Sequence, residues 1–288
     1  MKMEPTQIAG LGAIADRFDH VLLDQWGTLH EGGQIFPAAD DCVAHLRKAG
    51  KRVLVLSNSG KRADSNATRL GALGLPPDAY DGILTSGEVT WRGLKARREP
   101  FNRFGRTCFL IARGGDHSIV DGLDLTVVAD MMSADFILLA GLDDSATKPE
   151  QWRESLTAAA ARGVPMLCAN PDLKMFGASG LISAPGALAR FYDTLGGNVT
   201  FVGKPHAPIF IAALDRLGRP NPGRVLMIGD SLDHDVAGAR AAGMLALLIS
   251  SGVHRASLQS PSGDFRAIQT HSGARTWMPH WTMKHLSW

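Results

Sequence analysis

Polar side chains with complementary chemistry stand directly after short apolar runs along this chain. The runs are VLLDQWGTL, LSNS, GKP and GDSLDHD, and the side chains are Asp24, Ser57, Asn58, Lys204, Asp230 and Asp235. Apolar runs of this length are typical of buried strands, and the carboxyl ends of parallel strands meet at one edge of a sheet. We therefore expect these side chains to converge on one site.

A carboxylate, a lysine and further carboxylates can together transfer a phosphoryl group. Asp24 can act as a nucleophile and form a covalent intermediate. The phosphoryl group is anionic, so cations must neutralise the charge that develops, and Lys204 can supply one. A second is Mg²⁺, which prefers oxygen ligands and which Asp24, Asp230 and Asp235 could hold. Ser57 and nearby backbone N–H groups could bind the remaining phosphoryl oxygens.

Each of these residues taken alone also has a structural explanation. An acid after a strand is often a helix cap, Ser57 and Asn58 are common turn residues, and a lysine before a proline is usually a surface charge. The chemical interpretation depends on all four runs occurring in one chain, each at the end of a predicted strand.

The elements that must position these side chains alternate between strand and helix patterns, which predicts a mainly parallel α/β sheet. Apolar spacing predicts a helix through Ala39, Val43 and Leu46 and another through Ala67, Leu70 and Leu73. Strands are predicted at 20–24, 52–57, 107–112, 125–128, 135–141 and 164–170, and in the runs VTFVGKP, RVLMIGDS and ALLIS. A Rossmann-like core of residues 1–85 and 198–288 would then hold an inserted α/β domain of residues 86–197. In the tail from 251 to 288, periodicity is weak, and MPHWTMKHL could add an edge strand.

Composition indicates an ordinary globular protein. Hydrophobic residues make up 45% and charged residues 20% of the 288 residues, and the net charge of +2 gives no general field for nucleic acid or a membrane. The cysteines Cys42, Cys108 and Cys168 are odd in number and lack metal-binding spacing, which favours reduced thiols in the cytoplasm. We expect no signal peptide and no transmembrane helix.

The four runs resemble the motifs of the haloacid dehalogenase-like (HAD) superfamily, most of whose members are phosphatases. The position of the insert, the run GKPHAPIF and the run ANPD at 169–172 resemble subclass IIA. That subclass includes the p-nitrophenyl phosphatase, N-acetylglucosamine-catabolism and pyridoxal phosphatase types. The resemblance spans about residues 18–253, and it implies a Rossmann-like HAD core with an inserted C2-type α/β cap that closes over the site.

The resemblance also implies roles for individual residues. Asp24 would be the nucleophile and a metal ligand, Ser57 would hold phosphate, and Lys204 would neutralise charge. The other Mg²⁺ ligands would be Asp230, Asp235 and the backbone carbonyl of Trp26. Asn58, Asn170 and Asp172 would be candidates for contact with the substrate.

Trp26 departs from the family pattern, which has an aspartate at this place to protonate the leaving oxygen and later activate water. The substitution keeps the carbonyl and removes an acid–base group worth roughly 10²–10⁴-fold in rate. His30 could substitute for it, because its pKa range suits the role. Alternatively, the leaving group departs without protonation and Trp26 provides a stacking wall, or the activity is vestigial and the protein binds a phosphorylated ligand or partner. A haloacid dehalogenase also carries an aromatic residue here but has no need for the acids at 230, 233 and 235.

The sequence thus predicts an Mg²⁺-dependent phosphatase that acts on a small phosphorylated metabolite through an aspartyl-phosphate on Asp24. Sugar phosphates, pyridoxal phosphate and aryl phosphates are the candidate substrate classes. The alternative is an impaired HAD-like binding protein, and a dehalogenase is less favoured. Neither nucleic acid nor a membrane is expected as a partner, and a homodimer is compatible with the apolar insert.

Overall fold

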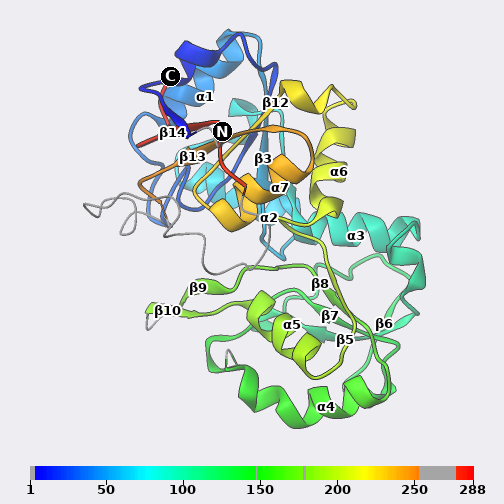
Figure 1. Ribbon diagram of the computed structural model, residues 1–288. Helices are drawn as coiled ribbons and strands as arrows, with labels where there is room; N and C mark the ends of the chain where they lie inside the picture. Colours follow the sequence, from blue (N-terminus) through cyan, green and yellow to red (C-terminus); the bar gives the residue numbers. More distant parts are fainter. Residues whose placement is uncertain (1–3, 147, 178–179, 253–276) are drawn as a thin grey trace. The chain divides into compact units, whose positions relative to one another are not determined.

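The computed structural model describes residues 4–146, 148–177, 180–252 and 277–288 (Figure 1). Contacts divide the chain into two compact units. Unit 1 comprises Met1–Ser57, Ala67–Leu84 and Phe210–Trp288, and unit 2 comprises Asn58–Asn66 and Thr85–Ile209. The domain boundaries at 85/86 and 197/198 stay a prediction. The weakly periodic part of the tail, residues 253–276, lies outside the described residues.

Unit 1 is built on a seven-stranded sheet in the order β1-β14-β13-β12-β2-β3-β4. Its strands are β1 (Thr6–Gln7), β2 (His20–Leu23), β3 (Arg52–Ser57), β4 (Gly82–Thr85), β12 (Val225–Gly229), β13 (Leu245–Ile249) and β14 (Trp281–Met283). The pairings of β12 with β13 and β2, and of β2 with β3, are parallel. The predicted α/β class is confirmed.

The register of the central strands places the ends of three strands at one edge. Leu23 of β2 pairs with Ile228 of β12 on one side and with Val55 of β3 on the other. The next residue, Asp24, donates its N–H to the Ile228 carbonyl at 2.9 Å. The acids that follow β2 and β12 therefore leave the sheet side by side.

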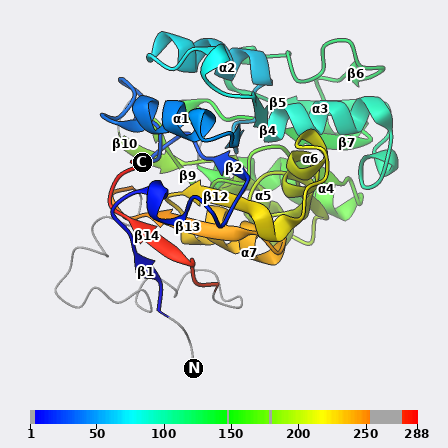
Figure 2. The same cartoon turned by 90° about the horizontal axis from the view of Figure 1, so that it is seen from above.

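Helices lie on both faces of this sheet (Figure 2). The helix α1 (Ala39–Lys48) buries Ala39, Cys42, Val43 and Leu46 in the same core as strand residues of β2 and β3. It lies on one face, and α7 (Ala237–Ala241) lies on the other (Figure 2). Two further helices, α2 (Ala63–Ala72) and α6 (Ala207–Arg216), each run from one unit into the other along the chain. Short helices of unit 1 are η1 (Leu11–Ile14), η2 (Pro77–Ala79), η8 (Pro222–Arg224) and the π-helix η9 (Leu232–Val236).

The C-terminal strand lies inside the sheet, and the prediction that it forms an edge is wrong. The strand β14 pairs with β13 on one side and with β1 on the other, both in parallel, so the edge strand is β1 (Figure 2). A strand of two residues has too little pattern to be found in a sequence, which is why β1 was missed. Its partner strand is far away in the chain: Thr6 pairs with Trp281, 275 positions further on.

Unit 2 contains a five-stranded parallel sheet in the order β11-β8-β7-β5-β6 and a separate antiparallel hairpin. The sheet strands are β5 (Thr107–Ile111), β6 (Thr126–Val127), β7 (Phe136–Leu139), β8 (Met166–Cys168) and β11 (Val199–Phe201), and the hairpin strands are β9 (Lys174–Gly177) and β10 (Gly180–Ser183). The hairpin was not predicted.

The helices of unit 2 accompany this sheet. They are α3 (Ser86–Ala96), α4 (Arg153–Ala161) and α5 (Pro185–Thr194), and the short helices are η3 (Phe101–Arg103), η4 (Arg113–Gly115), η5 (Met131–Ser133), η6 (Asp144–Ala146) and η7 (Pro149–Trp152). Leu156 of α4 and Leu188 and Tyr192 of α5 share one core with β7 and β8. The short strands predicted in the insert are thereby confirmed as elements.

All three cysteines are buried free thiols, as the sequence predicts. Burial raises the pKa of Cys42 and Cys168 to about 12 and that of Cys108 to about 11, so the thiolate is scarce at neutral pH. Among the described helices, none has the length and apolar character needed to cross a bilayer.

Candidate active site

Three carboxylates meet at the edge where β2 and β12 end. Oxygen atoms of Asp24, Asp230 and Asp235 all lie within 4.8 Å of one another, and all three residues are buried. We call these residues the acid cluster. Buried like charges at this spacing repel one another unless a cation neutralises them, and three oxygen donors suit a hard cation such as Mg²⁺. The three acids among the predicted metal ligands are therefore brought together.

Glycines let the backbone approach these acids closely. A Cβ at Gly27 would collide with the carboxylate of Asp230, one at Gly229 with that of Asp235, and one at Gly252 again with Asp230. Gly27 also has a φ of +78°, which favours glycine. The carboxylates therefore fit into a cradle of backbone in which a larger side chain has no room.

The turn after β12 holds Asp235 in place. Asp235 Oδ2 accepts the Ser231 N–H at 3.0 Å, while the Asp235 N–H donates to the Ser231 carbonyl at 3.1 Å. Ser231 caps the π-helix η9 by accepting the His234 N–H with its Oγ. Asp235 is 1% exposed, the least of the three acids. This exchange of hydrogen bonds orients the Asp235 carboxylate.

The loop between Asp24 and Gly32 carries Trp26. The N–H groups of residues 28, 29 and 30 point to the Gln25 carbonyl, and the Gly27 N–H donates to the His30 carbonyl at 2.9 Å. Trp26 is 37% exposed, and its ring meets the His30 ring edge-on with centroids 5.5 Å apart. Its side chain cannot transfer a proton as an aspartate would, so the backbone carbonyl is its one possible metal-binding group.

His30 is buried in this loop with a defined tautomer. Its Nδ1 accepts the Gly32 N–H at 3.0 Å. Burial, together with the smaller effect of the Arg69 charge, lowers the pKa of His30 to about 4. The ring is thus neutral at pH 7, and its proton lies on Nε2 because Nδ1 is the acceptor. His30 offers a buried N–H donor in this state, and its acid–base role stays a prediction.

Three buried polar atoms of the same loop are without hydrogen-bond partners in the described part of the chain. They are Gln25 Nε2, Thr28 Oγ1 and His30 Nε2. Buried polar groups rarely stay unsatisfied, so bound water would be expected to reach them. No sequence pattern indicates this feature, because Gln25 and Thr28 are ordinary residues in a turn.

In unit 2 the side chain of Asn58 ties two other predicted site residues together. Its Oδ1 accepts the Lys204 N–H at 2.6 Å, and its Nδ2 donates to the Lys204 carbonyl at 3.0 Å and to Asp172 Oδ1 at 2.7 Å. Asn58 and Lys204 are both buried. The amide of Asn58 is thus occupied in positioning Lys204, a role that the sequence analysis did not foresee.

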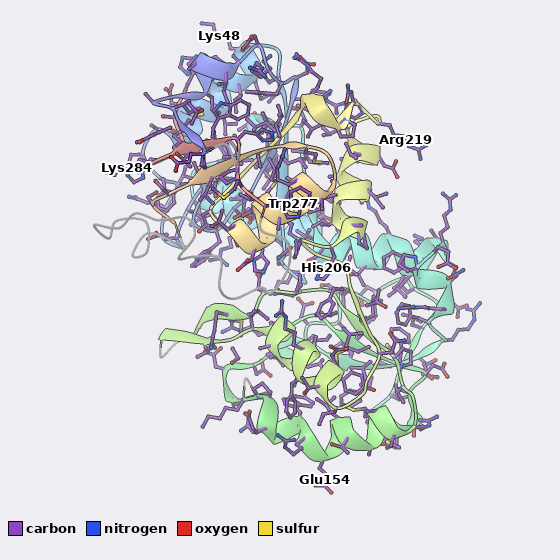
Figure 3. The ribbon with its side chains drawn as sticks, in the orientation of Figure 1. Lys48, Glu154, His206, Arg219, Trp277 and Lys284 are labelled. Atoms are coloured by element: carbon purple, nitrogen blue, oxygen red, sulfur yellow. The ribbon has the colours of Figure 1, made fainter. Side chains whose placement is uncertain are left out.

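The neighbouring loop completes this group. Asn170 Oδ1 accepts the Asp172 N–H at 3.0 Å, and the Asn170 carbonyl accepts the Cys168 S–H at 3.1 Å. A Cβ at Gly203 would stand 2.6 Å from both Asn58 Oδ1 and Pro171 Cδ, so Gly203 allows the two loops to meet. Nearby, His206 stacks on Phe201 with ring centroids 4.7 Å apart (Figure 3). Ser57, the last residue of β3, directly precedes Asn58 in the chain.

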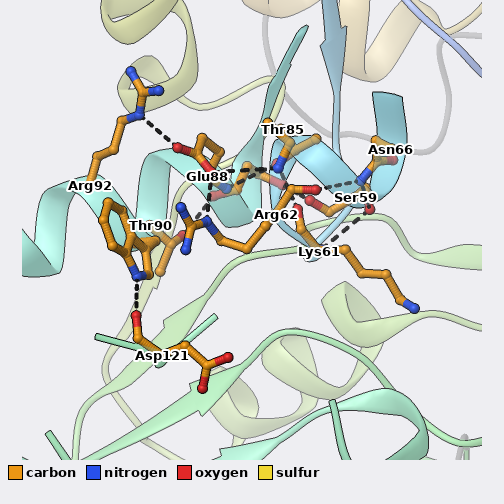
Figure 4. A network of polar contacts seen from close by, with 12 residues as sticks. Ser59, Lys61, Arg62, Asn66, Thr85, Glu88, Thr90, Arg92 and Asp121 are labelled. Carbon is orange, nitrogen blue, oxygen red and sulfur yellow. Dashed lines mark hydrogen bonds and ion pairs between the residues drawn. The ribbon is translucent and has the colours of Figure 1, made fainter. Parts of the chain in front are cut away.

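Unit 2 also has a buried carboxylate, Glu88, and its environment differs from that of the acid cluster in unit 1. Its Oε2 accepts from Arg62 Nε at 2.6 Å and its Oε1 from Arg92 Nε at 2.8 Å (Figure 4). Burial by itself would raise the pKa of Glu88, but the hydrogen bonds and charges of Arg62 and Arg92 outweigh it, and the pKa is lowered. We call these three residues the Glu88 network. It fastens the segment before α2 to α3.

Comparison with known proteins agrees with this architecture. A family model described as haloacid dehalogenase-like hydrolase matches residues 21–126, and one described as HAD-hydrolase-like matches residues 201–269. All three residues of the acid cluster fall within these matches.

Similar proteins cover nearly the whole chain. A crystal structure of a haloacid dehalogenase-like hydrolase from Brucella suis is 33% identical, with a TM-score of 0.81, over 97% of this chain and 99% of that one. The p-nitrophenyl phosphatase from Archaeoglobus fulgidus is 25% identical, with a TM-score of 0.71, over 93% and 96% of the two chains. The sugar-phosphatase AraL of Bacillus subtilis is 28% identical over 239 residues, which are 81% of this chain and 83% of that protein.

The predicted resemblance to subclass IIA, the group of p-nitrophenyl phosphatases, is therefore confirmed at the level of fold and family. The 33% identity with the Brucella suis hydrolase extends through both units, so the relationship does not depend on one motif. This chain belongs to the haloacid dehalogenase-like hydrolase family.

Proposed function

We propose that the chain is an Mg²⁺-dependent phosphatase that hydrolyses a small phosphorylated metabolite through an aspartyl-phosphate on Asp24. The observation that carries the proposal is the acid cluster, in which three buried carboxylates lie within 4.8 Å of one another at the ends of β2 and β12. Such a cluster costs stability, and it is useful where a cation is held for chemistry. The phosphatases among the similar proteins support the same reaction class.

Asp24, Asp230 and Asp235 would hold the Mg²⁺ together with the Trp26 carbonyl. When bound, Mg²⁺ supplies positive charge that offsets the charge of the phosphoryl group. The donor set fits this ion, since all its atoms are oxygens and the cradle of glycines leaves the carboxylates close together.

The chemistry proceeds in two steps. In the first, an Asp24 oxygen forms a bond to phosphorus while the bond from phosphorus to the ester oxygen breaks, and the electron pair leaves with the ester oxygen. In the second, water attacks the phosphorus of the aspartyl-phosphate, which releases inorganic phosphate and restores the Asp24 carboxylate. The second step needs a base. His30 is the candidate that the sequence offers, and it would accept the proton at Nδ1 only after that nitrogen releases the Gly32 N–H.

Ser57 and Lys204 would bind the phosphoryl oxygens, Ser57 by hydrogen bonds and Lys204 by charge. Asn58 would act through Lys204, because it holds the lysine backbone on both its N–H and its carbonyl. Asn170 and Asp172 would contact the substrate from the loop that Asn58 fastens. The candidate substrates are sugar phosphates, pyridoxal phosphate and aryl phosphates.

Release of inorganic phosphate tests this proposal. The panel consists of p-nitrophenyl phosphate, pyridoxal phosphate and sugar phosphates, each with Mg²⁺ or with EDTA, beside the Asp24→Asn variant. We expect release that requires Mg²⁺ and that Asp24→Asn loses. Release that persists in Asp24→Asn would exclude the covalent mechanism.

A second function is favoured by Trp26, which stands where the family has its acid. The chain could bind a phosphorylated ligand or partner without hydrolysing it. In that case ligands would raise the melting temperature, but no phosphate would be released from any compound. A third possible function is that of a dehalogenase. A dehalogenase needs no metal, so the carboxylates of the acid cluster make this function less favoured.

The proposal also includes the cellular compartment and the oligomeric state of the protein. Three unpaired thiols suit the reducing cytoplasm, where we expect the protein to act on a small molecule rather than on nucleic acid or at a membrane. A homodimer is proposed as well, and the molar mass in solution, measured by light scattering, would test it.

A further inference from the structure

Trp26 is fixed by three neighbours although 37% of it stays exposed. Its ring meets His30 edge-on at 5.5 Å, and the guanidinium carbon of Arg69 lies 5.7 Å from its ring centroid. A Cβ at Gly32 would stand 2.8 Å from Trp26 Cη2, so the indole packs directly on the Gly32 backbone. A side chain that is both exposed and held loses little conformational entropy when it binds a ligand.

Two features of the loop that carries Trp26 require glycine at position 32. Its φ of +97° is unfavourable for other residues, and its lack of a Cβ lets the indole approach. The Gly32 N–H also donates to His30 Nδ1, which fixes the ring against which Trp26 packs. The loop is therefore shaped to hold an indole at position 26.

Arg69 adds a positive charge to this surface. It lies on α2 and is exposed, and its guanidinium makes no ion pair with a carboxylate in the part of the chain that the structure describes. Its charge reaches the Trp26 loop, since it contributes to lowering the pKa of His30. An arginine beside an aromatic ring, without a carboxylate partner, can accept an anionic group of a ligand.

The position of this surface connects it with the reaction. Trp26 follows Asp24 by two residues, and the next residue, Gly27, lies against the carboxylate of Asp230. In place of an acid, this chain thus has an aromatic ring and a cation next to its candidate nucleophile. An acid protonates the leaving group, whereas a ring and a cation can bind a planar leaving group and stabilise its negative charge.

We propose that Trp26, Gly32 and Arg69 form the leaving-group site, and that this site selects phosphate esters of planar, acidic alcohols such as phenols and enols. The inference rests on the function proposed above and names its substrate class. As Asp24 bonds to phosphorus, the bond from phosphorus to the ester oxygen breaks and its electron pair stays on that oxygen. The alcohol leaves as a phenolate or enolate, which stacks on Trp26 and pairs with Arg69, and later takes a proton from water.

Three esters of falling leaving-group acidity test this inference, namely p-nitrophenyl phosphate, phenyl phosphate and glycerol 3-phosphate. The kcat and KM for phosphate release are measured with Mg²⁺ for the wild type, Trp26→Leu, Trp26→Phe and Arg69→Gln. Arg219→Gln is the matched control, because Arg219 is an exposed arginine whose ion pair, at 2.6 Å, is with Asp215 four residues away (Figure 3). Melting curves confirm that each variant is folded.

We expect kcat/KM of the wild type to fall steeply along this series. Arg69→Gln should lower kcat/KM for both aryl esters about tenfold, less than the roughly 10²–10³-fold cost of a buried donor because Arg69 is exposed. Trp26→Leu should raise KM for the aryl esters, whereas Trp26→Phe keeps a ring and should change it little. Neither change should affect glycerol 3-phosphate. Equal losses on all three esters, or a wild type that does not discriminate among them, would overturn the inference.

Binding separates this inference from the proposed function. Phenyl phosphate and glycerol 3-phosphate are titrated by calorimetry into Asp24→Asn and into the double variant Asp24→Asn/Trp26→Leu. A wild type that releases no phosphate would contradict the proposed phosphatase. Tighter binding of phenyl phosphate that the double variant loses would still support the leaving-group site, and equal binding of the two esters would refute it.

Discussion

The acid cluster of unit 1 and the Glu88 network of unit 2 both remove carboxylates from solvent, but they surround them differently. Asp24, Asp230 and Asp235 face one another within 4.8 Å, so that like charges are gathered. Glu88 instead receives hydrogen bonds from two arginines, at 2.6 and 2.8 Å. Both arrangements are buried, with Asp24 8% and Glu88 5% exposed.

This difference in surroundings indicates that the acid cluster is the candidate for catalysis and that the Glu88 network is structural. A carboxylate with arginine partners is satisfied within the protein and stabilises the contact between two segments. Three carboxylates at one point repel one another, so their retention makes sense where a cation held between them is used. Burial of an acid alone would not have distinguished the two sites.

The largest effect should follow from removing the nucleophile. Asp24→Asn should lower kcat by on the order of 10⁴-fold or more, as the loss of a covalent nucleophile does elsewhere. The same change removes one like charge from the acid cluster, so it should raise the melting temperature of the metal-free protein. Phosphate release and calorimetric melting in EDTA measure the two effects. A lower melting temperature in Asp24→Asn would mean that the cluster is not strained by repulsion.

Mg²⁺ should act on the acid cluster and leave the Glu88 network unaffected. At an Mg²⁺ concentration of about 100 times its Kd, binding to the folded state should add about 2.7 kcal/mol to the free energy of unfolding. Asp230→Asn and Asp235→Asn should lose most of this gain, and Glu88→Gln should keep it. Thermal melts with Mg²⁺ or EDTA test the comparison, and an equal gain in all variants would place the ion elsewhere.

Placing an aspartate at position 26 should change the choice of substrate. Trp26→Asp should raise kcat/KM for alkyl phosphates by up to about 10²-fold, since a general acid contributes roughly 10²–10⁴-fold where it is well placed. Activity on p-nitrophenyl phosphate should not rise, because its leaving group needs no proton. Loss of activity on every ester would instead favour Trp26 as a binding wall over the idea of a missing acid.

Glu88→Gln should destabilise the protein by about 2 kcal/mol, because it leaves Arg62 and Arg92 without the charge that they share. The pKa of Glu88 is lowered in the folded protein from a usual value of 4.5, so the charged form stabilises the fold above that pH. As the pH falls below about 4.5, this stabilisation is lost, and the difference between wild type and variant should shrink. Denaturant titrations at pH 7 and at acidic pH measure it.

The smallest effect belongs to an exposed pair. The ion pair between Arg219 and Asp215 is of the same chemical type as those of Glu88, with N and O 2.6 Å apart, but it is open to water. Arg219→Gln should change the free energy of unfolding by less than about 0.5 kcal/mol. A change as large as that in Glu88→Gln would show that burial does not separate the two cases.

The hydrophobic pattern along the chain predicts much of the fold and the site residues that stand at strand ends. Short apolar runs that end in polar residues predict β2, β3 and β12, and each polar residue falls where its strand ends. Because parallel strands share one carboxyl edge, Asp24, Asp230 and Asp235 could be expected together before any coordinates were known. Ser57 and Lys204 follow other predicted strands and belonged to the same expectation, and the family resemblance added support for their roles.

The pairing of short strands with distant partner strands could not be predicted from the sequence. The strand β1 has two residues, and it forms the sheet edge only because β14 lies beside it. The hairpin of β9 and β10 likewise depends on its partner strand. A short strand has no pattern of its own, since its stability comes from a partner strand, which for β1 lies at the other end of the chain.

By itself, then, the sequence determined the α/β class, the sheet edge that bears the acids and the absence of an acid at position 26. Only the tertiary structure decided what surrounds that position: Gly32 beneath the indole, Arg69 beside it, and a His30 whose proton lies on Nε2. It also decided that Asn58 holds the backbone of Lys204. The physical reason is that periodicity reports burial along one element, whereas the partner of a side chain is set by which elements meet.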